Sequence, residues 1–537
     1  MYQDRHRVGL STNGREKKMT FSKLLACFTA AALLVACSDQ QSSSVGQVAD
    51  EAKTATETAS MELAANDGGI PLSASSKTAM SQYKKVRKLA DKGDFIEANQ
   101  AARQLTEDDP DFVGGWIMLG NTSLSGEQFV KATRKASELS AKGTEGEQLW
   151  ADINMTFVTN DAEERLKLGK KLVDTYPEAP RAWLIYSGLL TGQNKHDEAR
   201  ASAAKVIKLA PDQAIGYNTL GFSYLYNSPK NFAKAEKNLK HAIKLEPGED
   251  NYRVNVGDVH RAMGDLEVAR SDYSGALEID ASNAVAAVKR AHVNSFLGNF
   301  DEARADYNMG IAAGEELTQS TLANYRAFVN LHAGDHEAAV EELKGELERI
   351  DTLEMPADQK IAARNFLLTN IADVCFNYDM LDEAASAVDH LSASLAEAGS
   401  NSGDENFVRQ QKATAAYWMG KLAARQGDYA AAEAQAEEFA QLLADDDNPR
   451  KLERYHELLG LIALKQEDYE GAIAHYRQAN LSTSPGAGDV KNIYMLARAL
   501  QGAGKTAEAS ELLHEVATWN FNSAWFAMLR KEAAGAS

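Results

Sequence analysis

The chain has 537 residues, too many for one compact core, so several domains or one long repeat array are expected. With 44% hydrophobic and 25% charged residues, the composition is globular and excludes a fully disordered chain or a collagen-like rod. The formal net charge of −20, without a basic patch to offset it, argues against nucleic acid as a partner.

The first residues have the features of an export signal. Lys17, Lys18 and Lys23 precede an apolar run over 24–35 that is too short to cross a bilayer as a helix. The run ends in Leu-Val-Ala-Cys, which resembles the lipobox of bacterial lipoproteins. This resemblance implies loss of residues 1–36, acylation of Cys37 and anchoring to the periplasmic face of a membrane, with the outer membrane favoured. An ordinary secretory signal and a buried apolar helix are the alternatives.

The stretch that follows is polar and small. Residues 38–76 are rich in Ser, Ala, Thr and acidic side chains and contain almost no large apolar ones. Such a stretch buries too little surface to offset the entropy of ordering. We therefore expect a lipidated N-terminus and flexible linker over 37–78.

From Met80 onward, sequence features recur with a period near 34 residues. Small residues recur where two helices of a hairpin would cross, and large apolar residues three and four apart mark one helical face. A proline ends the second helix of the unit. The clearest unit contains Tyr217, Leu220, Gly221, Tyr224, Ala235, Leu239, Ala242 and Pro247.

This pattern resembles the tetratricopeptide repeat (TPR). The resemblance implies an all-α fold: a right-handed α-solenoid of about twelve helical hairpins, because units of this length are stable only when stacked. Looser stretches at 346–364 and 398–411 are candidate hinges. We therefore expect an N-terminal array over 79–351 and a C-terminal array over 352–537.

Aromatic residues crowd the end of the sequence. We expect them to belong to a helix that caps the last exposed repeat face, with a partner-binding anchor as the alternative. The residues are Trp519, Phe521, Trp525 and Phe526.

Several short patterns resemble catalytic or metal motifs, but each fits the repeat better. Gly504-Lys505-Thr506 ends a loose phosphate-binding signature, yet it falls on the expected turn between helices. His332 and His336 flank another such turn and should diverge. His456-Glu457 begins like a zinc-protease motif without its second histidine, and Cys375 takes the place of a packing residue. We expect no enzyme activity, cofactor or metal.

In TPR proteins the first helix of each repeat lines a concave face. The resemblance therefore implies a groove for an extended or helical peptide, with ordinary packing between repeats as the alternative for each residue. The basic carboxylate clamp of chaperone-binding TPR domains is not matched, because its Lys/Asn/Lys/Arg set is missing. The expected groove residues are Asn218, Phe222, Asn251, Asp258, Arg261, His292, Asn324 and Phe328.

The function implied by these resemblances is a non-enzymatic, membrane-tethered scaffold that binds proteins in the bacterial cell envelope. Assembly, secretion, pilus export and polymer export are the processes it could serve. An accessory subunit or regulator of a cell-wall hydrolase, or of another envelope enzyme, is the alternative. A cytoplasmic co-chaperone is a further one if the lipobox is misread.

Overall fold

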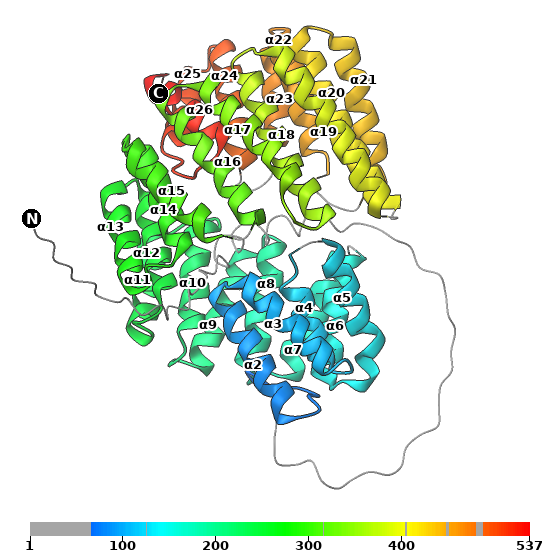
Figure 1. Ribbon diagram of the computed structural model, residues 1–537. Coiled ribbons are helices and arrows are strands. Elements are labelled where there is room, and N and C mark those ends of the chain that lie inside the picture. Colours follow the sequence, from blue (N-terminus) through cyan, green and yellow to red (C-terminus); the bar gives the residue numbers. More distant parts are fainter. Residues whose placement is uncertain are drawn as a thin grey trace, which may run out of the picture.

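The computed structural model describes residues 66–124, 126–159, 161–314, 316–402, 405–446, 451–479 and 487–536. Within them, the helices from α2 to α25 pair as twelve hairpins, and α26 follows alone, which confirms the predicted all-α solenoid of about twelve hairpins. In Figure 1 the hairpins from α2 to α9 form the lower part of the molecule. Those from α10 to α15 lie at the left, and α16 to α26 form the upper part.

The elements have the following bounds in chain order. They are β1 (Asn66–Asp67), β2 (Ile70–Pro71), α2 (Lys77–Lys92), α3 (Phe95–Asp108), α4 (Val113–Asn121), α5 (Gly126–Leu139), η1 (Ser140–Lys142), α6 (Glu145–Val158), α7 (Ala162–Thr175), α8 (Pro180–Gly192), α9 (His196–Leu209), α10 (Ala214–Tyr226), α11 (Phe232–Leu245), α12 (Asp250–Met263), α13 (Leu266–Ile279), α14 (Ala284–Leu297), α15 (Phe300–Ala313), α16 (Glu316–Ala333), α17 (His336–Thr352), α18 (Ala357–Asn377), α19 (Leu381–Ser402), α20 (Glu405–Gln426), α21 (Tyr429–Leu442), α22 (Glu453–Lys465), α23 (Tyr469–Ala479), α24 (Ala487–Gly502), α25 (Thr506–Ala517) and α26 (Ala524–Ala536).

The turn inside a hairpin follows from its sequence. Gly427 ends α20 with a φ of 83°, a left-handed conformation that glycine adopts without strain. Asp428 then caps α21, and its side chain accepts a hydrogen bond from the N–H of Ala431 (3.0 Å). Gly504 takes the same place after α24, with a φ of 75°. Gly504-Lys505 is therefore a turn between two helices, without the preceding strand that a phosphate-binding loop needs.

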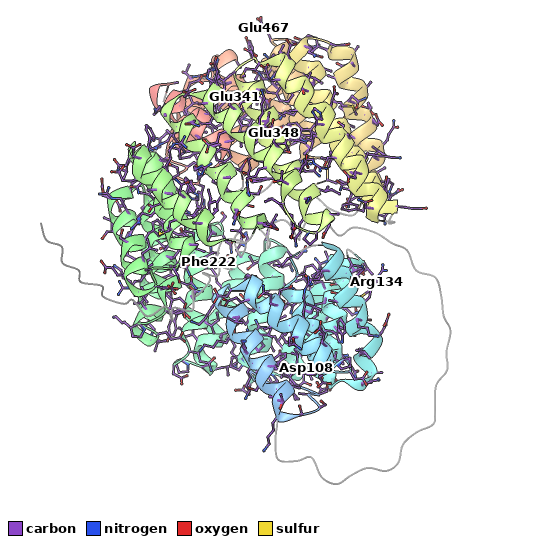
Figure 2. The ribbon with its side chains drawn as sticks, viewed as in Figure 1. Asp108, Arg134, Phe222, Glu341, Glu348 and Glu467 are labelled. Atoms are coloured by element: carbon purple, nitrogen blue, oxygen red, sulfur yellow. The ribbon has the colours of Figure 1, made fainter. Side chains whose placement is uncertain are left out.

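One hydrophobic core runs through the second half of the molecule, from Val254 to Ala533. It includes Ile350, Met355 and Ala363, which lie on both sides of the predicted border between the two arrays. The core is therefore continuous across that border, where α17 gives way to α18. Charged side chains project from the outer surface of the helices (Figure 2); labelled examples are Asp108, Arg134, Glu341, Glu348 and Glu467. None of the helices in the described ranges is both long and apolar enough to span a bilayer.

The end of the predicted linker is structured. Residues 66–76 include the antiparallel β1–β2 hairpin, whose Ile70 is fully buried in a cluster with side chains of α6. The hydroxyl of Thr144 donates to the carbonyl of Pro71 (2.7 Å), and Leu72 is buried against α2 and α4. The prediction of a flexible linker is therefore wrong for these residues. Two apolar side chains in a polar stretch suffice here, because the folded repeats supply the surface that buries them.

The crossing of α10 and α11 gives a first prediction. A Cβ added at Gly221 would lie 2.7 Å from Leu239 Cγ and 3.2 Å from the carbonyl oxygen of Ala235. We expect Gly221→Ala to lower the free energy of unfolding by about 1–3 kcal/mol through overpacking. Gly188→Ala is the matched control, because its Cβ would meet no atom within 4 Å on α8. The control should stabilise by about 0.5–1 kcal/mol. Urea unfolding followed by circular dichroism measures both, and equal effects would contradict the prediction.

Candidate functional site

The predicted groove residues lie on α10, α12, α14 and α16, the first helices of four successive hairpins. Asn218 and Phe222, on α10, are half-buried. Asn218 accepts a hydrogen bond from the Nδ2 of Asn255 (2.8 Å), and the ring of Phe222 packs against Tyr226, with ring centroids 4.3 Å apart. Figure 2 places Phe222 where the lower part of the stack meets the hairpins that follow. At this end of the groove the side chains contact each other and remain partly accessible.

Asn251 joins the first hairpin to the sixth. Its Nδ2 donates to the carbonyl of Lys92 (2.8 Å), at the end of α2, and the Lys92 ammonium pairs with Glu249. Nearby, the guanidinium of Arg181 donates two hydrogen bonds to Asp91 (2.6 and 3.0 Å). The array therefore closes on itself here, and Asn251 serves that closure.

Asp258 is the centre of a buried charged network. Its carboxylate has no exposed surface and pairs with Lys289 and with Arg261 (3.1 Å). It also accepts hydrogen bonds from the hydroxyls of Tyr273 (2.8 Å) and Tyr226 (3.0 Å). Burial alone would raise the pKa of Asp258, but the two cations outweigh burial and hold the pKa below its usual range. Asp258 therefore stays ionised and serves the packing of α12, α13 and α14.

His292, Asn324 and Phe328 are also buried. The rings of His292 and Phe328 both pack against Tyr325, with centroids 5.6 and 5.5 Å away. Neither ring nitrogen of His292 has a hydrogen-bond partner within the described residues, and burial lowers its pKa well below the usual value. The side-chain oxygen of Asn324 accepts from Asn370 (3.2 Å), whereas its Nδ2 has no such partner in the same part of the chain.

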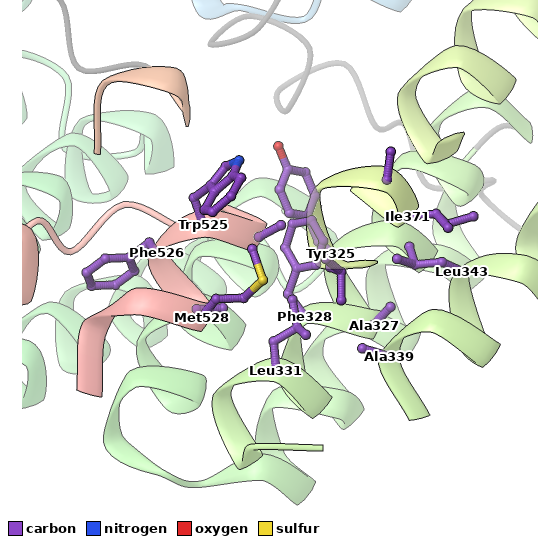
Figure 3. Packing of buried hydrophobic residues seen from close by; sticks show 14 of the residues in the cluster. Tyr325, Ala327, Phe328, Leu331, Ala339, Leu343, Ile371, Trp525, Phe526 and Met528 are labelled. Atoms are coloured by element: carbon purple, nitrogen blue, oxygen red, sulfur yellow. The ribbon is translucent and has the colours of Figure 1, made fainter. Parts of the chain in front are cut away.

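These side chains are buried because another part of the chain covers them. Residues 519–532, here called the C-terminal segment, comprise the connection after α25 and most of α26. Besides α24 and α25, α26 packs against α16 and α18, which lie more than 140 residues earlier in the sequence. In Figure 3, Trp525, Phe526 and Met528 of this helix face Tyr325, Phe328 and Leu331. The cap predicted for the last repeat thus crosses to the central repeats.

The connection before α26 enters the groove through an aromatic ring and an amide. The guanidinium of Arg261 lies over the ring of Phe521, 4.9 Å from its centroid. The side-chain amide of Asn522 donates to the hydroxyl of Tyr307 (3.0 Å), while its oxygen lies 3.1 Å from the Nε2 of His332. Two predicted groove helices and their partner are thus bridged by two residues of the segment.

Trp525 occupies a charged aromatic pocket. Its indole N–H donates to the carboxylate of Asp373 (2.8 Å), which also accepts from the ammonium of Lys421 (2.8 Å). That ammonium lies over the ring of Trp418, 4.2 Å from the centroid. Burial lowers the pKa of Lys421 to about 8 despite the carboxylate. The pocket therefore recognises an indole by a hydrogen bond and by cation–π contact.

Phe526, Arg530 and Lys531 complete the contact. The ring of Phe526 meets Phe296 edge to face, with centroids 5.2 Å apart. Arg530 donates to the carbonyl of Phe296 (2.7 Å), and Lys531 donates to the carbonyl of His332 (2.8 Å). The segment is therefore held by aromatic anchors and by side-chain hydrogen bonds to the backbone of the groove.

The histidine pairs singled out in the sequence behave differently. His332 lies under the C-terminal segment, whereas His336 stacks on Tyr378 with ring centroids 4.0 Å apart, so the two rings have different surroundings, as predicted. His456 does meet a second histidine across the α22–α23 hairpin: its Nδ1 lies 3.1 Å from that of His475. No group of three potential metal-ligating side chains includes them or occurs elsewhere in the described part of the chain.

Cys375 is a core residue. Its side chain is fully buried in the main core, and burial raises the pKa of its thiol to about 11. A thiol with such a pKa is a poor nucleophile at neutral pH. This agrees with the packing role predicted from its place in the repeat. Cys37 and the predicted signal peptide lie outside the described residues.

Sequence reasoning missed the pocket residues Phe296, Asp373 and Lys421. Their positions were visible as inner positions of first helices, but nothing in the sequence indicated that Trp525 would reach them. The aromatic cluster at 519–526 was the available signal. It was interpreted as a local cap because terminal repeats need one.

His332 gives a prediction for pH dependence. Burial lowers its pKa from 6.5 to about 4, so the unfolded chain binds more protons between these pH values. The stability that neutral His332 supports is complete above pH 6.5 and is lost as the pH falls towards 4. We expect this loss to be about 3 kcal/mol larger in the wild type than in His332→Gln. Urea unfolding at both pH values measures it, and the same loss in both proteins would contradict it.

Comparison with known proteins agrees with this geometry. Family models described as tetratricopeptide repeat match residues 167–214, 251–283, 419–486 and 463–532. The chain is a tetratricopeptide repeat protein. The matched stretches coincide with the hairpins α7–α10, α12–α13 and α20–α26.

Individual relatives of this TPR protein share only part of it. Heat shock protein STI1 of Saccharomyces cerevisiae is 38% identical over 93 residues, which are 17% of this chain and 15% of that protein. A TPR protein of Parabacteroides merdae has 20% identity and a TM-score of 0.32, over 50% of this chain and 92% of that one. A chain in the structure of the APC/C hetero-tetramer Cut9-Hcn1 has 16% identity and a TM-score of 0.35, over 81% and 77%.

Repeats of this family support a general role as a scaffold for protein–protein interaction. The TPR fold is typically non-catalytic, in agreement with the prediction that the chain is not an enzyme.

Proposed function

We propose that this TPR protein is a non-enzymatic scaffold that binds segments of other proteins in its concave groove while a lipid on Cys37 tethers it to a bacterial envelope membrane. Protein binding is supported by one observation above all: the groove already holds a polypeptide. The C-terminal segment lies across four first helices and is bound by aromatic pockets and by hydrogen bonds to backbone carbonyls. Grooves that bind helical peptides use the same kinds of contact.

The tether rests on the sequence before the repeats. An apolar run over 24–35 ends at the lipobox-like cysteine, and a polar stretch separates that cysteine from the first structured residues. Several acyl chains, each contributing about 0.8 kcal/mol per buried methylene, would hold the protein at a membrane surface. The polar stretch would let the array reach partners away from it. We place the protein on the periplasmic side, with the outer membrane favoured, in assembly, secretion, pilus export or polymer export.

Metabolic labelling with a fatty-acid analogue tests the tether. We expect label and membrane association in the wild type and neither in Cys37→Ala. Cys27→Ala is the matched control, because this cysteine lies in the same apolar run and should leave both unchanged. Label that persists in Cys37→Ala would contradict the assignment.

Mild crosslinking in intact cells, followed by mass spectrometry, tests protein binding. We expect a reproducible envelope protein that crosslinks to the groove helices and is reduced in the Cys37→Ala cells. Crosslinks only to cytoplasmic proteins would overturn the envelope role. Absence of any protein crosslink from a correctly lipidated chain would overturn the scaffold role.

A further inference from the structure

The contacts of the C-terminal segment resemble those of a bound ligand. Its residues reach side chains on α12, α14, α15, α16 and α18, which are 152 to 234 residues distant in the sequence. The connection between α25 and α26 is not helical, so the segment lies across the array instead of continuing the last hairpin. The segment therefore binds the groove through its own set of side chains.

The floor beneath the segment is unusually polar for a core. Asp373, Lys421, His332, His292 and Asn324 are all buried there. Protein cores satisfy nearly all buried polar groups, yet His292 and Asn324 keep side-chain nitrogens without a hydrogen-bond partner within the described residues. Such groups suit a surface that must also recognise a ligand, because they offer directional contacts that an apolar core does not need.

The chemistry of the segment identifies what the floor recognises. Trp525 supplies an indole N–H for Asp373 and a ring beside Lys421, and Phe526 supplies an edge for Phe296. One helical turn later, Arg530 and its neighbour place cations on backbone carbonyls at the ends of α14 and α16. The recognised pattern is thus two adjacent aromatic residues followed by two basic residues one turn later on one helix.

We propose that the floor formed by α14, α16, α18 and α20 is a binding site for a helical segment of a partner protein with this pattern, and that residues 519–532 occupy the site until such a partner displaces them. This inference rests on the proposed scaffold function, since it names the class of segment that the groove takes. The covalently attached segment competes at a high effective concentration, so the free chain binds partners weakly. A partner with the same anchors gains access when it outcompetes this segment.

A peptide of residues 519–536, carrying a fluorophore, tests the proposal on the full chain by fluorescence anisotropy. We expect at least tenfold tighter binding to the double variant Trp525→Ala, Phe526→Ala than to the wild type, because the competitor is weakened. Trp183→Ala is the matched control; this tryptophan donates to the carbonyl of Pro177, far from the groove, and the variant should bind like the wild type. A peptide that itself carries Trp525→Ala should lose binding at least tenfold.

Equal peptide binding by the wild type and the double variant, with unchanged circular dichroism, would overturn the proposal. Hydrogen exchange of the wild-type chain provides a measurement that needs no variant. We expect amides of α26 to exchange at least tenfold faster than those of α24, since α26 opens without the array. Equal protection of both helices would also overturn it. Neither measurement involves lipid or a natural partner, so failure here is distinguishable from failure of the proposed function.

Discussion

Asp258→Ala is expected to lower the free energy of unfolding by about 3–5 kcal/mol. The substitution removes the carboxylate that pairs with Lys289 and Arg261 and leaves two buried cations without a counter-charge. It also leaves the hydroxyl of Tyr273 without its acceptor. Urea unfolding followed by circular dichroism at neutral pH measures the loss.

Asp111→Ala is the control for this prediction. Asp111 pairs with Lys142 on the surface, where both side chains are more than half exposed (69% and 59%). An exposed pair contributes little, so the control should change stability by less than about 1 kcal/mol. If Asp258→Ala cost no more than the control, the buried network would not stabilise the fold. Asp258 would then regain its predicted role in contacting a ligand.

Glu457→Ala is expected to cost a similar amount, about 3–5 kcal/mol. The carboxylate is buried and accepts hydrogen bonds from the ammonium of Lys491 and the hydroxyl of Tyr417. Burial alone would raise its pKa, but Lys491 and Lys421 outweigh burial and hold the pKa at about 2. The stability it contributes is therefore complete above pH 4.5 and is lost as the pH falls towards 2.

Urea unfolding of Glu457→Ala and of Glu438→Ala checks this prediction, because Glu438 is exposed on α21. The control should stay within about 0.5 kcal/mol of the wild type. A loss at pH 6 that shrinks at pH 3 is the expected signature. An unchanged stability of Glu457→Ala would contradict the structural role and return attention to the motif-like His456-Glu457 sequence.

Some functional signals in the sequence proved to be structural ones. His456-Glu457 resembles the start of a zinc-protease motif, yet the glutamate belongs to a buried ion pair between α22 and α24. Gly504-Lys505 resembles part of a phosphate-binding loop, yet it is the turn of the last hairpin. Both could be interpreted from sequence because the repeat period fixes which positions are turns and which are inner faces.

The predicted groove was identified at the level of helix faces but not at the level of accessibility. Asn218 and Phe222 remain half-buried, whereas Asp258, Asn324 and Phe328 are enclosed. Helical periodicity places all of them on first helices of the hairpins. Whether such a face is open depends on which distant segment covers it, and the periodicity contains no information about that.

The sequence by itself determined the helical hairpins, their turns and their approximate number, because these depend on interactions within about 34 residues. Gly427 and Asp428 end one helix and cap the next through local backbone geometry alone. The tertiary structure decided that Ile70 docks on α6, that Asn251 closes the first hairpins onto α12, and that Trp525 reaches Asp373. These contacts join residues far apart in the chain, and they form only because the accumulated rotation of stacked hairpins brings their surfaces together.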